Sequence, residues 1–375
     1  MRKFAVLVMA MVMAMGSTLL WAQDDKETIK IGFGGALLGN LASYGLSGFY
    51  GVEYAVLKTN AEGGLLGKQI EIVREDDGCD PALASSAATK LMGSGLTVVV
   101  GHTCSGATRS ALSVYGDNVL AISPSATEVS LTEDGKSPYF FRTTPRDDAQ
   151  SSLWIKLLKN KDFKKVAVLH DKGDYGKALA DLAKAEIDAD KDSGIEIVLF
   201  EGVTSGQVSY DSIISKVKNS GADAVLWGGY YNDASKLAIQ MRNKKVDTVI
   251  IGADGLYDDR YVKMAGEAAE GSYATGQVDL SQNPMAVAAV EDHKKRHAED
   301  TGTYFLYSAG ATQALLAAIE KTGNTTDLAT IKKHLQEDTV ETAMGPIRFD
   351  EKGDVIGAGF KMYEIKGGKF VEVEM

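Results

Sequence analysis

The sequence has few cysteines and no excess of basic residues, and both shortages limit what the protein can do. Its 375 residues contain 2 cysteines, and 40 lysines and arginines are outnumbered by 51 aspartates and glutamates, for a formal net charge of −11. A nucleic-acid-binding surface needs a clustered basic face, so this charge argues against nucleic-acid partners. The self-repulsion of an acidic chain favours a monomer.

Long apolar runs are also scarce, and the one at the N-terminus is short. Arg2 and Lys3 precede an apolar stretch over residues 4–15, and the small residue Ala22 follows. This order is typical of a secretory signal peptide, which we predict over residues 1–22 with cleavage near Ala22. A membrane anchor is less favoured, because a spanning helix needs roughly 20 apolar residues. No cysteine stands near the cleavage point, which argues against a lipoprotein.

The two cysteines, Cys79 and Cys104, form an even pair in a chain that we expect to be exported. Exported proteins use such pairs for disulfides. A bond between them would close a loop of about 25 residues and would stabilise the fold by roughly 3 kcal/mol in the chain-entropy model. Two buried free thiols are the alternative, which the spacing leaves open.

Short β-branched runs alternate with amphipathic stretches over most of the chain. The runs at 28–33, 69–74 and 97–100 are each followed by a helical pattern, which predicts a parallel sheet covered by helices. The composition changes at 140–145, and a second series of alternations starts at 166–169. Because the chain is longer than one typical domain, we expect two α/β lobes, each with a doubly wound parallel sheet.

The loops that follow the predicted strands carry small hydroxyl, acidic or aromatic residues. Ser105 and the stretch 123–127 follow two strands of the first series, and Asp254 follows a strand of the second. In open α/β sheets, ligands bind beyond the carboxyl ends of the strands. We therefore expect a ligand cleft between the two lobes that closes by hinge motion. The tyrosines expected to form one wall of this cleft are Tyr44, Tyr175 and Tyr230.

Three enzyme signatures fail in this sequence. The glycine-rich loop after the first strand has Leu37 where a dinucleotide-binding fingerprint needs its third glycine. Ser105 lacks the G-x-S-x-G elbow of a hydrolase nucleophile. His293 and His297 have helical spacing without the glutamate of a zinc protease. We therefore expect no enzyme, no cofactor and no metal, and we keep an exported hydrolase built on Ser105 as the weakest alternative.

Seven passages form a pattern that is more specific together than singly. They are DDGCDP (76–81), GHTCS (101–105), PSAT (124–127), HDKGDYG (170–176), GGY (228–230), AAEG (268–271) and MGPIRFDEKGD (344–354). With them, the mature chain resembles the periplasmic leucine/isoleucine/valine-binding proteins over essentially its whole length. These proteins are the substrate-binding components of branched-chain amino-acid ABC transporters.

The resemblance implies the fold of a type I periplasmic binding protein, in which two lobes are joined by three crossovers. It assigns residues 23–143 and 277–345 to the N-terminal lobe, and residues 144–276 and 346–375 to the C-terminal lobe. It also implies that the two cysteines are bonded to each other and that the protein works in the periplasm.

The resemblance further implies how an amino acid is held. Ser105 and Thr127 would donate their hydroxyls to the ligand carboxylate, helped by nearby backbone amides. The carbonyl of Ser125 would accept from the ligand ammonium. Its acidic partner would be Asp254, which is one methylene shorter than the family's glutamate and would bind directly or through a water. The other expected ligand-binding residues are Tyr44, Thr103, Ala126, Tyr175, Tyr230 and Tyr304.

Thr103 and Tyr304 occupy positions that are more apolar in the branched-chain binders. The resemblance nonetheless implies a receptor that captures an amino acid and delivers it to an inner-membrane ABC permease, with leucine, isoleucine or valine as the expected ligand. The alternative is the same fold binding an amide, a urea, or an aromatic or polar amino acid, for transport or for sensing.

Overall fold

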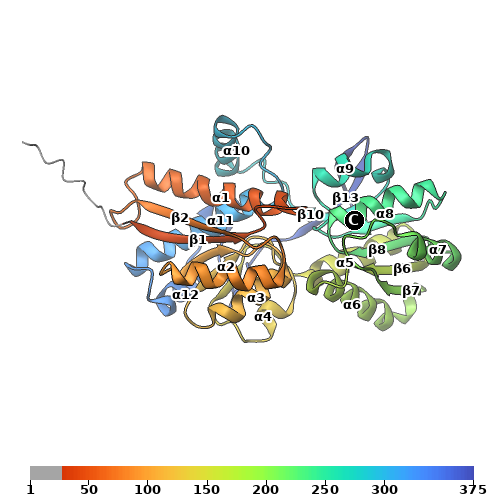
Figure 1. Cartoon of the computed structure of the whole chain (residues 1–375), viewed down its shortest axis with the longest axis horizontal. Helices are drawn as coiled ribbons and strands as arrows, with labels where there is room; N and C mark the ends of the chain where they lie inside the picture. The colour runs from red at the N-terminus through yellow and green to blue at the C-terminus, as the bar shows by residue number, and fades with distance from the viewer. Residues whose placement is uncertain (1–27) are drawn as a thin grey trace, which may run out of the picture.

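The computed structural model describes residues 28–375, which form two α/β lobes side by side (Figure 1). The predicted signal peptide lies outside the described residues. No helix in the described part of the chain is long and apolar enough to cross a membrane.

The first lobe contains a five-stranded parallel sheet with the strand order β2-β1-β3-β4-β5. The strands are β1 (Ile29–Gly35), β2 (Ile70–Asp76), β3 (Val98–Gly101), β4 (Leu120–Ser123) and β5 (Phe140–Arg142). Successive residues of a strand face opposite sides of the sheet. Val98 and Val100 belong to one apolar core and Val99 to another. Both faces are therefore apolar and need a cover of helices.

Helices cover both faces of this sheet. One face packs against α1 (Ala42–Ala61), α11 (Phe305–Thr322) and α12 (Leu328–Glu337), and the other against α2 (Pro81–Gly93), α3 (Ser105–Tyr115) and the short α4 (Ser130–Glu133). The start of α2 shows how the sequence sets a boundary. Asp80 Oδ1 accepts hydrogen bonds from Ala82 N at 2.8 Å and Leu83 N at 3.0 Å, and Pro81 occupies the first helical turn.

The second lobe contains a seven-stranded sheet with the order β14-β13-β10-β9-β8-β6-β7. The strands are β6 (Lys165–His170), β7 (Glu196–Gly202), β8 (Ala224–Gly228), β9 (Val249–Gly252), β10 (Tyr273–Gln277), β13 (Phe360–Lys366) and β14 (Lys369–Val373). Five are parallel, and β13 and β14 extend one edge as antiparallel strands. The predicted α/β class with two doubly wound lobes is therefore confirmed, with an antiparallel extension in the second.

Helices flank the second sheet in the same two-sided way. One core contains residues of α5 (Asp147–Asn160) and α6 (Asp174–Ala189). The other core contains residues of α7 (Asp211–Ser220), α8 (Tyr231–Asn243) and α9 (Asp259–Ala265). Short 3-10 turns, η1 (Lys191–Ser193) and η2 (Gly266–Ala269), follow α6 and α9.

The chain passes between the lobes after β5, after β10 and before β13. After the second crossing, α10 (Pro284–Arg296) packs on the first lobe, through Ala289 beside Tyr54 of α1. The third crossing differs from the boundary expected at residue 345. Ile347 and Phe349 lie in the core of the first lobe.

The segment before the third crossing stays in the first lobe because its apolar side chains find their partners there. It begins with the hairpin of β11 (Val340–Thr342) and β12 (Gly345–Ile347). The rings of Phe349 and Phe141 then lie 5.3 Å apart. We therefore propose lobe boundaries in which residues 346–355 join the first lobe.

Candidate ligand-binding cleft

A small cavity of about 10 Å³ lies between the lobes. A void of this size has room for about one water, so the two lobes are closed on each other around the site. Its lining residues are Tyr44, Thr103, Cys104, Ser105, Ser125, Tyr175, Tyr230, Asp254, Gly255 and Tyr304. All the predicted site residues belong to this lining except Ala126 and Thr127, which are buried behind it.

The first-lobe wall consists of Thr103, Cys104, Ser105 and Ser125. A disulfide joins Cys104 to Cys79, with 5.3 Å between their Cα atoms, so the open question of free thiols is settled in favour of the bond. Ser105 begins α3, where unpaired backbone N–H groups and the helix dipole favour an anion. Ser105 Oγ accepts from Glu128 N at 3.3 Å, which leaves its own hydrogen free to donate.

Hydrogen bonds between adjacent strand-end loops hold this wall in shape. Ser123 Oγ donates to His102 O at 2.6 Å and accepts from Ala126 N at 2.9 Å. The wholly buried Arg142 donates to Ala126 O at 3.1 Å and pairs with Asp354 Oδ1 at 2.5 Å. The loop that carries Ser125 is therefore fixed from both sides.

The second-lobe wall consists of Tyr175, Tyr230, Asp254 and Gly255. Asp254 follows β9 and is 2% exposed. Its Oδ1 accepts from Tyr175 OH at 2.7 Å and from Gln150 Nε2 at 2.9 Å, and its Oδ2 accepts from Tyr304 OH at 3.0 Å. Burial raises the pKa of Asp254, and these donors act in the opposite direction. Within residues 28–375, no cationic side chain pairs with this acid.

Two tyrosines of the first lobe reach across the cleft. Tyr44 OH donates to Gly255 O at 2.7 Å, in addition to the bond from Tyr304 to Asp254. The ring of Tyr44 lies 5.9 Å from that of Tyr230 and 5.5 Å from that of Tyr304. Burial raises the pKa values of these three tyrosines well above the usual range, so their hydroxyls stay neutral.

Residues 28–369 match the model of a protein family described as periplasmic binding protein. The chain belongs to the periplasmic binding protein family. The Leu/Ile/Val-binding protein of Escherichia coli is 34% identical over 340 residues, which are 90% of this chain and 91% of that protein. The leucine-, isoleucine-, valine-, threonine-, and alanine-binding protein of Pseudomonas aeruginosa is 35% identical over 341 residues, 90% of each chain.

A solved structure supports the same family. It is the branched-chain amino acid transporter substrate binding protein LivJ from Streptococcus pneumoniae in complex with isoleucine. It is 29% identical, has a TM-score of 0.81, and covers 92% of this chain and 100% of its own. These relatives are binding proteins, so the family is one of substrate binding rather than of catalysis.

Three residues of this periplasmic binding protein contribute to the cleft without a signal in the sequence. Gln150 binds Asp254 from α5, and Asp147 lies on the far side of Gln150. Tyr231 OH donates to Asn40 O of the first lobe at 2.6 Å. Gln150 and Asp147 lie in the first turn of a helix, where polar residues are common and give no sign of a binding site. Only the crossover just before them could have directed attention there.

An ion pair also links the lobes at the edge of the cleft. Arg109 Nε of α3 donates to Asp174 Oδ2 at the start of α6, at 3.1 Å. The same guanidinium pairs with Glu128 of the first lobe. Both partners of the interlobe pair are partly exposed, at 34% and 47%.

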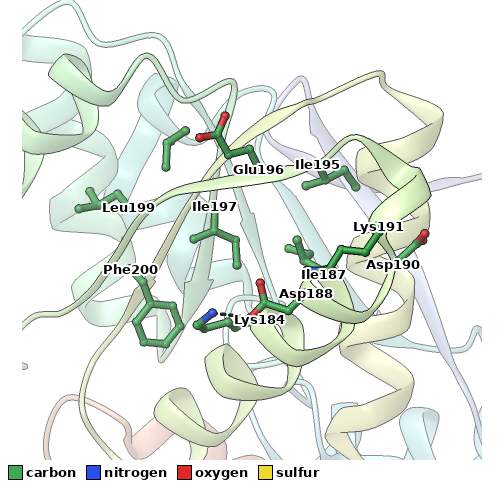
Figure 2. A pocket seen from close by; sticks show the side chains of 11 residues that line it. Lys184, Ile187, Asp188, Asp190, Lys191, Ile195, Glu196, Ile197, Leu199 and Phe200 are labelled. Atoms are coloured by element: carbon green, nitrogen blue, oxygen red, sulfur yellow. Dashed lines mark hydrogen bonds and ion pairs between the residues drawn. The ribbon is translucent and has the colours of Figure 1, made fainter.

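Another hollow of this binding protein lies outside the cleft, between α6 and β7 of the second lobe (Figure 2). Ile197 and Phe200 of β7 line it, together with the ion pair between Lys184 and Asp188. The hollow has no contribution from the first lobe. Within residues 28–375, no group of three or more histidine, cysteine, aspartate or glutamate side chains could hold a metal ion.

Proposed function

We propose that this periplasmic binding protein captures a free amino acid in the interlobe cleft and delivers it to an inner-membrane ABC permease. One observation carries the proposal: Asp254 lies on one side of a small cavity, and the hydroxyl of Ser105 at the start of α3 lies on the other. An anionic group facing an anion-binding helix end is complementary to a zwitterion.

The proposed contacts follow this polarity. Ser105, Thr127 and the amides at the start of α3 bind the ligand carboxylate, whereas Asp254 and the carbonyl of Ser125 bind the ammonium. Each charge-assisted hydrogen bond contributes about 1.5–3 kcal/mol. The two ends of the ligand are held by different lobes, so ligand binding favours their closure.

The ligand side chain would meet tyrosine rings and a threonine. Tyr44, Tyr230 and Tyr304 offer apolar ring faces, and Thr103 offers a methyl group next to a hydroxyl. Burial of a leucine-like side chain contributes about 1.5–3 kcal/mol. We expect leucine, isoleucine or valine. The hydroxyls of this wall support the alternative of a small polar or aromatic ligand, and the relative from Pseudomonas aeruginosa is also named for threonine and alanine.

The proposed setting follows from the family and the N-terminal sequence. Residues 1–22 would direct export and be removed, and the mature protein would act in the periplasm as a monomer. A relative of known structure is the substrate binding protein of an amino acid transporter, which supports a permease as the partner of this protein. A sensory role of the same binding event is the alternative.

A thermal-shift screen of residues 23–375 with the disulfide intact tests the proposal. The ligands are the twenty amino acids, urea and short amides. A ligand at 100 times its dissociation constant stabilises the folded state by about 2.7 kcal/mol. We expect a shift with leucine, isoleucine or valine, and none with their N-acetyl or methyl ester forms. Stabilisation by urea or amides alone would contradict the proposal.

A further inference from the structure

A second buried acid lies directly behind Asp254. Asp147, the first residue of α5, has no exposed surface. Gln150 Nε2 donates to Asp147 Oδ1 and to Asp254 Oδ1, at 2.9 Å each. Gln150 Oε1 in turn accepts from Asp254 N at 2.9 Å. One side-chain amide therefore bridges two carboxyl groups and uses both of its hydrogens to do so.

The other oxygen of Asp147 and the hydroxyl of Thr127 are both without a hydrogen-bond partner in the described part of the chain. Both atoms, Asp147 Oδ2 and Thr127 Oγ1, are buried. The two residues are joined through their backbones, because Asp147 N donates to Thr127 O at 3.0 Å. The Thr127 hydroxyl is near enough to lower the pKa of Asp147. Buried polar atoms are rarely left without a partner, so one hydrogen shared between these two atoms would satisfy both, and either residue can supply it.

The charged and titratable groups around Asp147 favour one proton on the pair of acids. Burial and then the charge of Asp254 raise the pKa of Asp147 well above its usual range. The tyrosines of the cleft that sense its charge are Tyr175 and Tyr230. Arg142 on β5 acts against this shift by its charge, but its guanidinium is already bound to Asp354, Thr132 and two carbonyls.

The hydrogen bonds decide which of the two acids takes the proton. Asp254 accepts from Gln150, Tyr175 and Tyr304. Asp147 accepts from the Gln150 side chain alone among formed side-chain bonds. Donors directed at a carboxylate favour its charged form, so Asp254 keeps the charge and Asp147 takes the proton.

We propose that Asp147 is a neutral positioning residue whose Oδ2–H donates to Thr127 Oγ1. Thr127 can then turn its own hydrogen toward a ligand carboxylate, and Asp254 remains the only charged acid of the pair. This inference rests on the proposed function, in which Thr127 binds the carboxylate and Asp254 the ammonium. The one proton on Asp147 therefore affects both ends of the site. It leaves the Thr127 hydroxyl free to donate to the ligand carboxylate, and, with Gln150 between the two acids, it leaves Asp254 charged for the ammonium.

Matched variants distinguish this arrangement from the reverse one. An asparagine at 147 has the same shape as a neutral aspartic acid: its carbonyl accepts from Gln150 and its amide donates to Thr127. We expect Asp147→Asn to weaken binding by about threefold, and Asp254→Asn by about tenfold or more, because only the second removes a charge. Asp147→Ala removes both hydrogen bonds, so it should bind the amino acid more weakly than Asp147→Asn does. Calorimetric titration with the amino acid found in the screen measures all four proteins.

The pH profile adds a readout that a purely structural role would not change. Wild type and Asp147→Asn should lose affinity together as the pH falls and Asp254 is protonated. Asp254→Asn should lack that loss. The proposal is wrong, and Asp147 carries the charge, under either of two outcomes. Asp147→Asn keeps its full affinity as the pH falls, or it binds the amino acid as weakly as Asp254→Asn does.

A measurement without ligand separates this inference from the proposed function. Infrared spectra of the ligand-free proteins are recorded at neutral pH and compared with each other. Wild type and Asp254→Asn should show the band of a protonated carboxyl group, and Asp147→Asn should lack it. A wild-type protein without that band would overturn the inference, even if amino acids bind. A wild-type protein with the band that binds no amino acid would overturn only the proposed function.

Discussion

The first-lobe wall and the second-lobe wall of the cleft differ in what they offer a charged ligand. The first wall consists of hydroxyls and a helix start, held by a disulfide and by loop-to-loop hydrogen bonds. The second contains a buried acid surrounded by the donors Gln150, Tyr175 and Tyr304. A buried neutral dipole costs free energy unless it is hydrogen-bonded, and a buried charge costs far more and needs several partners. The first wall therefore depends on its scaffold, and the second on its hydrogen bonds.

Loss of the disulfide should have the largest effect, and it tests the dependence of the first wall on its scaffold. The double variant Cys79→Ser with Cys104→Ser is expected to lower the free energy of unfolding by roughly 3 kcal/mol, because the unfolded chain gains the entropy of an open loop. Urea unfolding measures this loss. A reducing agent should reproduce it in wild type and leave the variant unchanged. Equal stability of the two proteins would contradict the prediction.

Removal of the acid tests the second wall. Asp254→Ala should weaken amino-acid binding by about 1.5–3 kcal/mol, because the ligand ammonium loses its counter-charge. Calorimetric titration checks the value, and circular dichroism confirms that the variant is folded. An unchanged affinity would remove Asp254 from the site.

The pH dependence of binding examines the same acid without a substitution. Burial raises the pKa of Asp254, so it takes up a proton at a higher pH than an exposed aspartate does. The ligand ammonium needs the charged form. Affinity should therefore be full at high pH and fall as the pH falls through the raised pKa of Asp254, over a titration from about pH 8 to about pH 4. Affinity that rises on acidification would contradict this sign.

A single hydroxyl of the first wall should matter less than the acid. Ser105→Ala removes one donor and leaves the backbone amides of α3, so we expect a loss of about 1 kcal/mol in binding. Ser113→Ala on the exposed side of the same helix is the matched control, since its hydroxyl donates to Arg109 O of its own helix. Equal affinities of the two variants would show that the amides alone bind the carboxylate.

The smallest effect is expected at the edge of the cleft, where the two walls meet through a partly exposed ion pair. Arg109→Gln should weaken binding by about 0.5 kcal/mol at low salt, because it removes the interlobe bond to Asp174. The difference should shrink at high salt. Lys177→Gln, which removes an ion pair within α6, is the control. A loss that is independent of salt would point to packing rather than to charge.

The sequence predicted one wall better than the other for physical reasons. Strand ends and hydroxyl-rich loops can be recognised locally, so Ser105 and Ser125 were predicted from them, whereas Thr103 came from the family resemblance; all three line the cavity. Gln150 was missed because its partner Asp254 stands 104 positions away, and only the packing of α5 against the second sheet brings them together.

The later lobe boundary that we propose near residue 355 depends on similarly distant contacts. The tail has an extended, alternating pattern throughout, and this pattern does not say which sheet or core receives it. Phe349 packs on Phe141, a residue far earlier in the chain. Local periodicity thus predicts an element, whereas its partner is decided by distant residues.

Both tryptophans of the second lobe stand directly behind the binding residues. Trp154 Nε1 donates to Gly252 O at 2.8 Å, two residues before Asp254, and Trp227 Nε1 donates to Tyr230 O at 3.3 Å. Indole emission responds to the field and polarity around the ring, and these two rings are anchored to the carbonyl groups of the cleft. The protein therefore has a built-in optical reporter, through which ligand capture can be followed in real time without a dye.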